Sequence, residues 1–275
     1  MPYATARDGT RIYYKDWGSG PPVVLVHGWP LSSDTFDDAA LALAEAGHRV
    51  IFHDRRGFGR SDQPWDGYDY DTFTSDVEAV LDDAGVSGPV AIAGFSMGGG
   101  EVARFVSRNP QRVSKAVLIG SVVPFLLKTD DHPDGAPREM FDGIVEAIRK
   151  DDADFFRGFF KSFFGVGIIK HPVSDGVLDD AWRQAMMAGL KPIVACVRAF
   201  SETDFRPDLA SFTMPTLIIH GTDDQTVPID ITARAVARAV PHANLVEYDG
   251  AHGIFASHKD KLIDDLVEFL REDAR

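Results

Sequence analysis

Hydrophobic runs of strand length alternate with amphipathic segments along most of the chain. Seven runs predict β-strands at residues 10–14, 23–26, 49–52, 90–93, 113–119, 216–220 and 244–247. Five segments with helical spacing of apolar residues predict helices at 35–46, 71–83, 98–107, 230–239 and 259–272. The run 23–26 is apolar at every position, as in a strand buried on both faces. The alternation predicts an α/β protein in which helices flank a mostly parallel sheet.

The interval from residue 121 to residue 212 interrupts this alternation. It contains helical stretches but no convincing strand, and it holds eleven of the nineteen phenylalanines. Phe159 and Phe163 lie four positions apart, so they would share one face of a helix. We therefore predict one sheet core, residues 1–120 and 213–275, into which residues 121–212 are inserted as a helical cap with an apolar underside.

The overall charge narrows the classes of partner. The chain has 275 residues and a formal net charge of −14, from 42 acidic and 28 basic residues. Nucleic-acid binding depends on Lys and Arg side chains that neutralise phosphates, so this charge argues against a nucleic-acid partner.

Signals of cellular location are few. The single cysteine, Cys196, lies in an apolar run and is interpreted as a buried core thiol, so the chain has no internal disulfide. Such usage permits a reducing environment, and we predict a cytoplasmic protein. The first residues lack the pattern of a signal peptide, and no stretch approaches the ~18 apolar residues of a membrane span. We expect no membrane partner.

The sequence Gly94-Phe95-Ser96-Met97-Gly98 is the sharpest chemical signal. It follows a predicted strand and opens a predicted helix, which is the context in which Gly-x-Ser-x-Gly marks a nucleophilic serine. Side chains at Gly94 and Gly98 would collide with neighbouring backbone in so tight a turn. The helix N-terminus behind Ser96 offers free N–H groups to a developing oxyanion.

A nucleophilic serine needs a base, and the base needs a carboxylate that orients it. His252 follows the predicted strand 244–247, which places it at the carboxyl edge of the sheet, where ligands bind in such folds. The other histidines are interpreted as structural or exposed. The acid is expected after the strand 216–220, where Asp223 and Asp224 are adjacent and composition does not separate them.

The loop after the strand 23–26 is expected to supply a second oxyanion donor. The predicted donors are the N–H groups of Trp29 and Met97, because a glycine at position 28 lets this backbone approach Ser96. Pro30 fixes its own φ and restricts Trp29 to extended conformations. His27 is interpreted as a residue that braces the loop.

Two other patterns carry no chemistry of their own. Residues 54–62 resemble a phosphate loop only superficially, since they lack its Lys-Ser/Thr ending, and we interpret them as a braced loop. The Asp-Asp pairs are scattered, and no calcium-loop or His-x-x-x-His pattern occurs, so we expect no metal.

Longer stretches extend the match beyond the predicted triad. Residues 15–18, 54–65, 94–100 and 202–208 resemble the bacterial cofactor-free haloperoxidases and their aryl-esterase relatives, which have the α/β-hydrolase fold. The runs Arg-Arg-Gly-Phe-Gly-Arg-Ser and Phe-Ser-Met-Gly-Gly-Gly are fairly specific to this group. The resemblance extends from about Tyr3 to Leu270.

The resemblance implies an α/β-hydrolase fold with an eight-stranded sheet. It assigns the acid to Asp224 and the oxyanion donors to Trp29 and Met97. It implies an apolar substrate pocket formed by Pro30, Val122, Phe125, Phe159, Phe163 and Val227. It also implies that the protein needs no cofactor and forms a homo-oligomer, either a trimer or a hexamer.

The same resemblance implies perhydrolase activity. Hydrogen peroxide would intercept an acyl-serine to give a peracid, which oxidises halide without a metal. Family members with proline after the oxyanion tryptophan are associated with stronger perhydrolysis, and Pro30 fits that pattern. Ile144 and Ile229 stand where some relatives have aromatic residues, which leaves the shape of the pocket open.

Our hypothesis is a serine hydrolase that cleaves small carboxylic esters through an acyl-Ser96 intermediate, with peroxide as an alternative acyl acceptor. A dehalogenase or epoxide hydrolase on this fold would need an aspartate at position 96. A lactam or carbon–carbon bond hydrolase would use the same triad, and a substrate panel is needed to separate it. A non-catalytic ligand-binding protein could keep the fold but need not keep a complete triad.

Overall fold

The computed structural model describes residues 2–271. Eight strands form one sheet in the order β1-β2-β4-β3-β5-β6-β7-β8. The strands are β1 (Tyr3–Thr5), β2 (Arg11–Gly18), β3 (Pro22–Val26), β4 (Arg49–His53), β5 (Val90–Phe95), β6 (Val113–Ile119), β7 (Thr216–Gly221) and β8 (Asn244–Tyr248). β2 is antiparallel to both of its neighbours, and all later pairs are parallel. The predicted α/β class with a mostly parallel eight-stranded sheet is confirmed.

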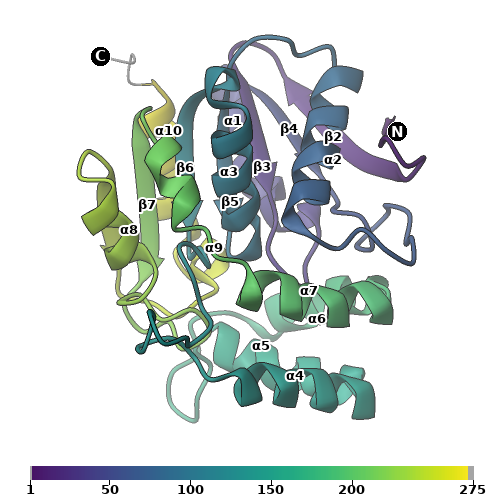
Figure 1. The fold of residues 1–275 in the computed structure, drawn as a ribbon, viewed down its shortest axis with the longest axis vertical. Helices are drawn as coiled ribbons and strands as arrows, with labels where there is room; N and C mark the ends of the chain where they lie inside the picture. The colour runs from purple at the N-terminus through teal and green to yellow at the C-terminus, as the bar shows by residue number, and fades with distance from the viewer. Residues whose placement is uncertain (1, 272–275) are drawn as a thin grey trace.

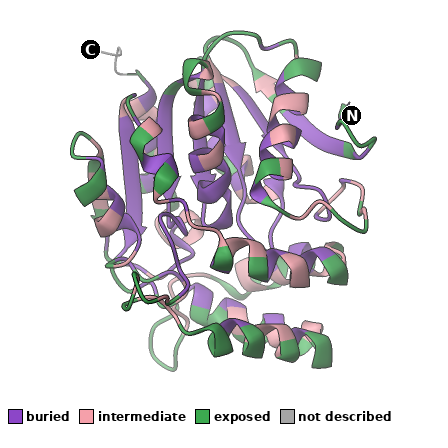
Figure 2. Cartoon of the chain, viewed as in Figure 1, coloured by how far each residue is buried: buried purple, intermediate pink, exposed green. Residues whose placement is uncertain are grey.

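Helices flank this sheet. They are α1 (Asp37–Glu45), α2 (Tyr70–Asp83), α3 (Met97–Arg108), α8 (Ala233–Ala239), α9 (Ile254–Ser257) and α10 (Lys259–Arg271), with short 3-10 turns η1 (Ser33–Phe36), η2 (Pro110–Arg112) and η3 (Pro207–Ser211). Every residue of β5 and β7 is buried, and Figure 2 shows the central strands as buried along their length. Because neighbouring residues of a strand point to opposite faces, both faces of these strands are covered.

The strand order places the chemistry at one edge. From β3 the chain crosses to β4 on one side and later returns to β5 on the other. The carboxyl ends of β3 and β5 are therefore neighbours, with Val26 paired to Gly94. Crevices at such a switch in strand order bind ligands in open α/β sheets. The loops that follow β3, β5, β7 and β8 all start at this edge.

The interval 121–212, all of which the structure describes, adds no strand to the sheet. Its helices are α4 (Arg138–Lys150), α5 (Asp152–Phe163), α6 (Asp175–Met187) and α7 (Leu190–Glu202). Figure 1 shows these four helices gathered at one end of the sheet, and Figure 2 shows their mixture of buried and exposed positions. The division into core and cap at residues 120 and 213 stays a prediction.

Some details differ from the sequence-based expectations, and among them β2 extends to Gly18, four residues beyond the predicted strand 10–14. β1 and α9 were not predicted, because three and four residues are too short to show a period. α8 begins at Ala233 rather than at residue 230, since Thr232 has a non-helical backbone and its hydroxyl donates to the carbonyl of Pro228. Position 272, the predicted end of the last helix, lies outside the described residues.

No helix within residues 2–271 is long and apolar enough to cross a bilayer. Cys196 lies in α7 and is fully buried, as expected, and burial raises the pKa of its thiol to about 12.

Candidate active site

Ser96 stands at the junction of β5 and α3 in a strained conformation. Its φ of 53° and ψ of −118° make it the one non-glycine residue with positive φ in the described chain. Such a backbone costs on the order of 1–3 kcal/mol and is found where function requires it. Ser96 is the residue directly before the first turn of α3, where the first N–H groups have no helical partner.

Close backbone packing explains the glycines around this turn. A Cβ on Gly94 would overlap the carbonyl of Gly98, and a Cβ on Gly98 would overlap the carbonyl of Val26. A Cβ on Gly28 would lie 3.0 Å from the Cβ of Ser96 and 2.8 Å from the ring of Phe95. The loop after β3 therefore lies against the serine, as its glycine predicted.

Two later loops bring a histidine and an aspartate to Ser96. The Oγ of Ser96 donates to Nε2 of His252 over 2.9 Å. Nδ1–H of His252 donates to Oδ2 of Asp224 over 2.6 Å. Ser96 is 5% exposed, Asp224 4% and His252 1%, so the three side chains form a chain of hydrogen bonds that is nearly closed to bulk water.

Asp224 is bound from several directions. Its Oδ1 accepts the N–H groups of Thr226 and Val227 at 2.9 and 2.8 Å. Nε2–H of His220 lies 3.3 Å from Oδ2 and also donates to the carbonyl of Val227. Burial alone would raise the pKa of Asp224, but His252 and the hydrogen bonds of His220 and His252 hold that pKa well below its usual range. Asp224 is therefore a carboxylate near neutral pH.

Asp223 has a different environment. Its side chain is 58% exposed and faces Lys170 at 3.4 Å. The geometry thus places Asp224 beside His252 and Asp223 at the surface.

Aromatic rings fix the orientation of the imidazole. The ring of Phe163 meets His252 edge-on at 4.8 Å between centroids, and the ring of Phe95 lies 4.9 Å away. Gly253 N–H donates to the carbonyl of Phe163, which ties the histidine loop to α5. The interval 121–212 therefore helps to position His252.

Residues of the same interval also fix the side chain of Trp29. Its indole N–H donates to the carbonyl of Ile193 in α7 over 3.1 Å, and its ring contacts those of Phe156, Phe159 and Phe200 at about 5.5 Å. Within the described chain, neither the backbone N–H of Trp29 nor that of Met97 donates a hydrogen bond to a protein group. Both remain available to a bound oxyanion.

A small apolar cavity of about 50 Å³ opens onto Ser96. Its lining residues are Trp29, Ser96, Val122, Leu126, Met140, Phe141, Ile144, Phe159, Phe200, Thr226 and Val227. Three of the six predicted pocket residues, Val122, Phe159 and Val227, are in this set. Phe163 instead packs against His252, and Phe125 packs against His132 and Arg206. Pro30 is buried and follows Trp29 through a cis peptide bond. None of these three lines the cavity.

Sequence reasoning missed most of the α4 contribution. Met140, Phe141 and Ile144 line the cavity from the first turns of this helix. Their spacing, with an interval of four residues between Met140 and Ile144, places these two side chains on one helix face. That spacing was visible in the sequence, but nothing local indicated that this face is turned toward Ser96. His220 was interpreted only as a buried residue, and its contact with Asp224 depends on tertiary packing.

A buried polar network braces the loop after β3. Nε2 of His27 accepts the N–H of Arg55 at 2.9 Å, and Nδ1–H donates to the carbonyl of Gly28 at 2.8 Å. The guanidinium of Arg55 donates to the carbonyl of His27 and to the carboxylate of Glu101 in α3. Burial, together with Arg55, holds the pKa of His27 well below its usual range, so this ring is neutral. These contacts agree with the bracing role predicted for His27.

The loop 54–62 is held by the same kind of contact. Asp54 accepts hydrogen bonds from Ser33 and Arg60. Arg56 forms a bidentate ion pair with Asp76. The side chains of Asp54, Arg56 and Arg60 are thus bound to groups of the protein itself, which agrees with the braced loop predicted here.

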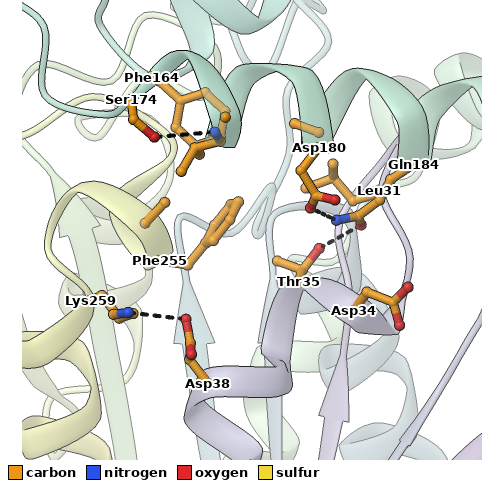
Figure 3. A pocket seen from close by; sticks show the side chains of 14 residues that line it. Leu31, Asp34, Thr35, Asp38, Phe164, Ser174, Asp180, Gln184, Phe255 and Lys259 are labelled. Carbon is orange, nitrogen blue, oxygen red and sulfur yellow. Dashed lines mark hydrogen bonds and ion pairs between the residues drawn. The ribbon is translucent and has the colours of Figure 1, made fainter.

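A second, larger hollow of about 390 Å³ lies between η1 and α1, α6, and the segment of α9 and α10. Figure 3 shows its polar walls, with Asp38 paired to Lys259 and Gln184 donating to Asp180. None of Ser96, Asp224 and His252 lines it. The residues capable of nucleophilic chemistry therefore lie at the small apolar cavity and not in this hollow.

Comparisons with known proteins agree with this geometry. The family model described as the alpha/beta hydrolase fold matches residues 21–259. A non-heme chloroperoxidase of Kitasatospora aureofaciens is 44% identical over 99% of this chain and 100% of its own length. A bifunctional esterase/perhydrolase of Acinetobacter calcoaceticus is 43% identical over 98% of this chain and 100% of its own. The crystal structure of a bromoperoxidase from Bacillus anthracis superposes with a TM-score of 0.93 at 42% identity, covering 98% of this chain and 100% of that one.

Proposed function

Because the chain belongs to the alpha/beta hydrolase family, among the non-heme haloperoxidases and esterase/perhydrolases, we propose that it hydrolyses small carboxylic esters. As a side reaction, it transfers their acyl group to peroxide. This is the family that the sequence resemblance predicted. The activity named for the relatives and the hydrogen-bonded Ser96 support the same reaction class.

In the acylation step, Ser96 attacks the ester carbonyl while Nε2 of His252 takes the hydroxyl proton. Asp224 holds the other ring nitrogen by its 2.6 Å hydrogen bond and stabilises the imidazolium that forms. The N–H groups of Trp29 and Met97 would donate to the oxyanion, an interaction worth on the order of 10²–10³ in kcat for one donor. His252 then passes the proton to the leaving alkoxide.

In the deacylation step, His252 activates a second nucleophile. Water returns the carboxylic acid and free Ser96. Hydrogen peroxide in the same place gives a peroxycarboxylic acid, which then transfers oxygen to halide in solution. The apolar lining of the cavity limits the water that competes, and its volume of about 50 Å³ favours short acyl groups.

The single observation that carries this proposal is the relay from Ser96 through His252 to Asp224, closed by two hydrogen bonds of 2.9 and 2.6 Å. It is tested with a panel of esters graded by acyl length and of lactams, assayed with and without peroxide and bromide. We expect short acyl esters to be preferred, and peracid and brominated product to appear only with peroxide. A preference for lactams over all esters would instead indicate that the protein is a lactamase.

The nucleophile is tested separately. A fluorophosphonate should label the wild-type protein stoichiometrically at Ser96, and Ser96→Ala should abolish p-nitrophenyl acetate turnover. Substantial turnover by the variant would reject the assignment. Absence of labelling in a folded wild-type protein would instead favour a non-catalytic ligand-binding role.

We also propose that copies of the chain assemble, on the resemblance alone. Light scattering of the purified protein should give the mass of a trimer or hexamer of 30.1 kDa subunits, and a monomer mass would contradict this. The cytoplasmic location stays a prediction from the sequence.

A further inference from the structure

We propose that Met140 is a site of turnover-dependent oxidation: the peroxycarboxylic acid formed at Ser96 transfers an oxygen atom to the Met140 thioether before it escapes into solution. This inference rests on the perhydrolysis proposed above. It concerns a side chain that takes no part in that chemistry.

The position of Met140 is the first support. Its side chain lines the same cavity as Ser96. It is also 46% exposed, whereas Ser96 is 5% exposed. Because Met140 both lines the cavity and reaches solvent, we place it at the mouth of the cavity, within reach of product that leaves Ser96.

The lining offers no competing thioether. Met140 is the one sulfur-containing residue in it, beside aliphatic, aromatic and hydroxyl side chains that include the indole of Trp29. Met97 follows Ser96 in sequence but is fully buried and does not line the cavity. A peracid formed here therefore meets one soft nucleophile.

The chemistry balances with the reagents already present. The sulfur lone pair attacks the terminal peroxide oxygen, and the O–O bond breaks. The peracid is reduced to the carboxylic acid, which keeps the proton, and the thioether is oxidised by two electrons to the sulfoxide. No metal or additional oxidant is needed.

The chain provides its own reference residue. Met187, at the end of α6, is 48% exposed, nearly the same as Met140, but it does not line the cavity. Oxidant that reaches the protein from bulk solution should attack both. Oxidant delivered from Ser96 should attack Met140 first, because its concentration is highest inside and at the mouth of the cavity.

Oxidation would alter the site. A sulfoxide places a polar oxygen at the edge of an apolar lining that binds the acyl group. We expect the KM for apolar esters to rise as Met140 is oxidised, so that ester hydrolysis declines with the number of peracid turnovers.

The experiment follows both methionines by peptide mass spectrometry. Wild-type enzyme is incubated with an acetate ester, hydrogen peroxide and a large excess of free methionine, which consumes peracid once it leaves the protein. Trypsin cuts after Arg138 and Arg149, so Met140 lies alone in its peptide, and fragmentation separates Met186 from Met187. Methionine sulfoxide in the medium, corrected for the ester-free sample, measures peracid output independently.

We expect Met140 to be oxidised several-fold faster than Met187 during turnover. The excess should vanish in Ser96→Ala, with peroxide alone, and when preformed peracetic acid replaces the ester. Met140→Leu, measured against its own starting rate, should lose ester hydrolysis more slowly during turnover than wild type or Met187→Leu.

Two results would overturn the inference. One is normal peracid output with Met140 and Met187 oxidised equally. The other is the same excess at Met140 with preformed peracid in Ser96→Ala, which would mean that Met140 is merely more reactive. Absence of peracid in the medium would instead contradict the proposed perhydrolysis, so the two failures are distinguishable.

Discussion

At the residue scale, the two neighbouring aspartates show how environment assigns a chemical role. Asp224 is buried, accepts two backbone N–H groups and contacts two histidines. Asp223 is exposed and faces a lysine across 3.4 Å. An exposed pair of this kind contributes little to stability, on the order of 0–1 kcal/mol. The difference between them lies in packing and not in the side chains themselves.

We therefore expect Asp224→Asn to lower kcat for p-nitrophenyl acetate by on the order of 10⁴, because an amide neither stabilises the imidazolium nor selects its tautomer. Asp223→Asn is the matched control and should keep kcat close to that of the wild type. Both variants should have the wild-type circular dichroism. A larger loss in Asp223→Asn than in Asp224→Asn would reverse the assignment.

The lowered pKa of Asp224 also has a consequence for stability. A carboxyl whose pKa is lower in the folded than in the unfolded state stabilises the fold above the unfolded pKa, and this contribution is lost as the pH falls. The thermal unfolding temperature of the wild type should thus fall more steeply on acidification than that of Asp224→Asn. Parallel curves for the two proteins would contradict this.

At the element scale, Gly98 in the first turn of α3 and Gly143 in the interior of α4 have opposite meanings. In α3 a Cβ on Gly98 would overlap the carbonyl of Val26, so this glycine allows the nucleophile helix to approach β3. In α4 a Cβ on Gly143 would meet nothing within 4 Å. An interior glycine without such a contact lowers helix stability by about 1 kcal/mol relative to alanine.

Gly98→Ala should therefore abolish ester hydrolysis or prevent folding, since backbone would have to move directly behind Ser96. Gly143→Ala should raise the free energy of unfolding by up to about 1 kcal/mol and keep the activity. Urea unfolding and p-nitrophenyl acetate rates measure both effects. A fully active Gly98→Ala would show that the contact between α3 and β3 is not required.

At the scale of the whole molecule, a buried polar cluster connects the elements that carry the site. Arg55 joins the loop after β3, through His27, to Glu101 in α3. His53, the last residue of β4, lies 3.9 Å from Glu101, and neither of its ring nitrogens has a hydrogen-bond partner among the described residues. Burial first, and then the charge of Arg55, lowers the pKa of His53 to about 4.

This cluster makes acid stability testable. Because the pKa of His53 is lowered from 6.5 to about 4 on folding, the unfolded state takes up a proton in this pH range and the folded state does not, so about 3 kcal/mol of stability is lost as the pH falls from 6.5 toward 4. Burial raises the pKa of Glu101 to about 7, which acts in the opposite direction between pH 4.5 and 7. Comparison with a variant isolates the histidine contribution.

His53→Leu should be at least as stable as the wild type at neutral pH, since it removes an unpaired buried ring, and it should lose less stability on acidification. His171 is exposed, so His171→Gln is the control and should follow the wild type. Urea unfolding at several pH values measures the difference. Equal acid sensitivity in all three proteins would contradict the assignment.

Much of the fold was predictable because its signals are local. The run 23–26 is apolar throughout and the run 113–119 is largely apolar, and β3 and β6 occupy these positions to within a residue. The Gly-x-Ser-x-Gly turn combines a strand, a tight bend and a helix in one continuous segment, so Ser96 was identified from sequence. Of the lining from α4, the family resemblance indicated Ile144, but Met140 and Phe141 were missed, because amphipathic spacing tells which side chains share a face but not what that face packs against.

What the sequence by itself determined is therefore the order of strands and helices, the nucleophilic turn, and a short set of acid and base candidates. These depend on periodicity and on residue chemistry within a few positions. Local patterns left Asp223 and Asp224 open, and the family resemblance assigned Asp224; only the tertiary structure shows that Asp224 meets His252, that His220 supports it, and that Met140 lines the cavity. Each of these facts depends on burial and on contacts between segments far apart in the chain, which the free energy of packing selects and no local pattern encodes.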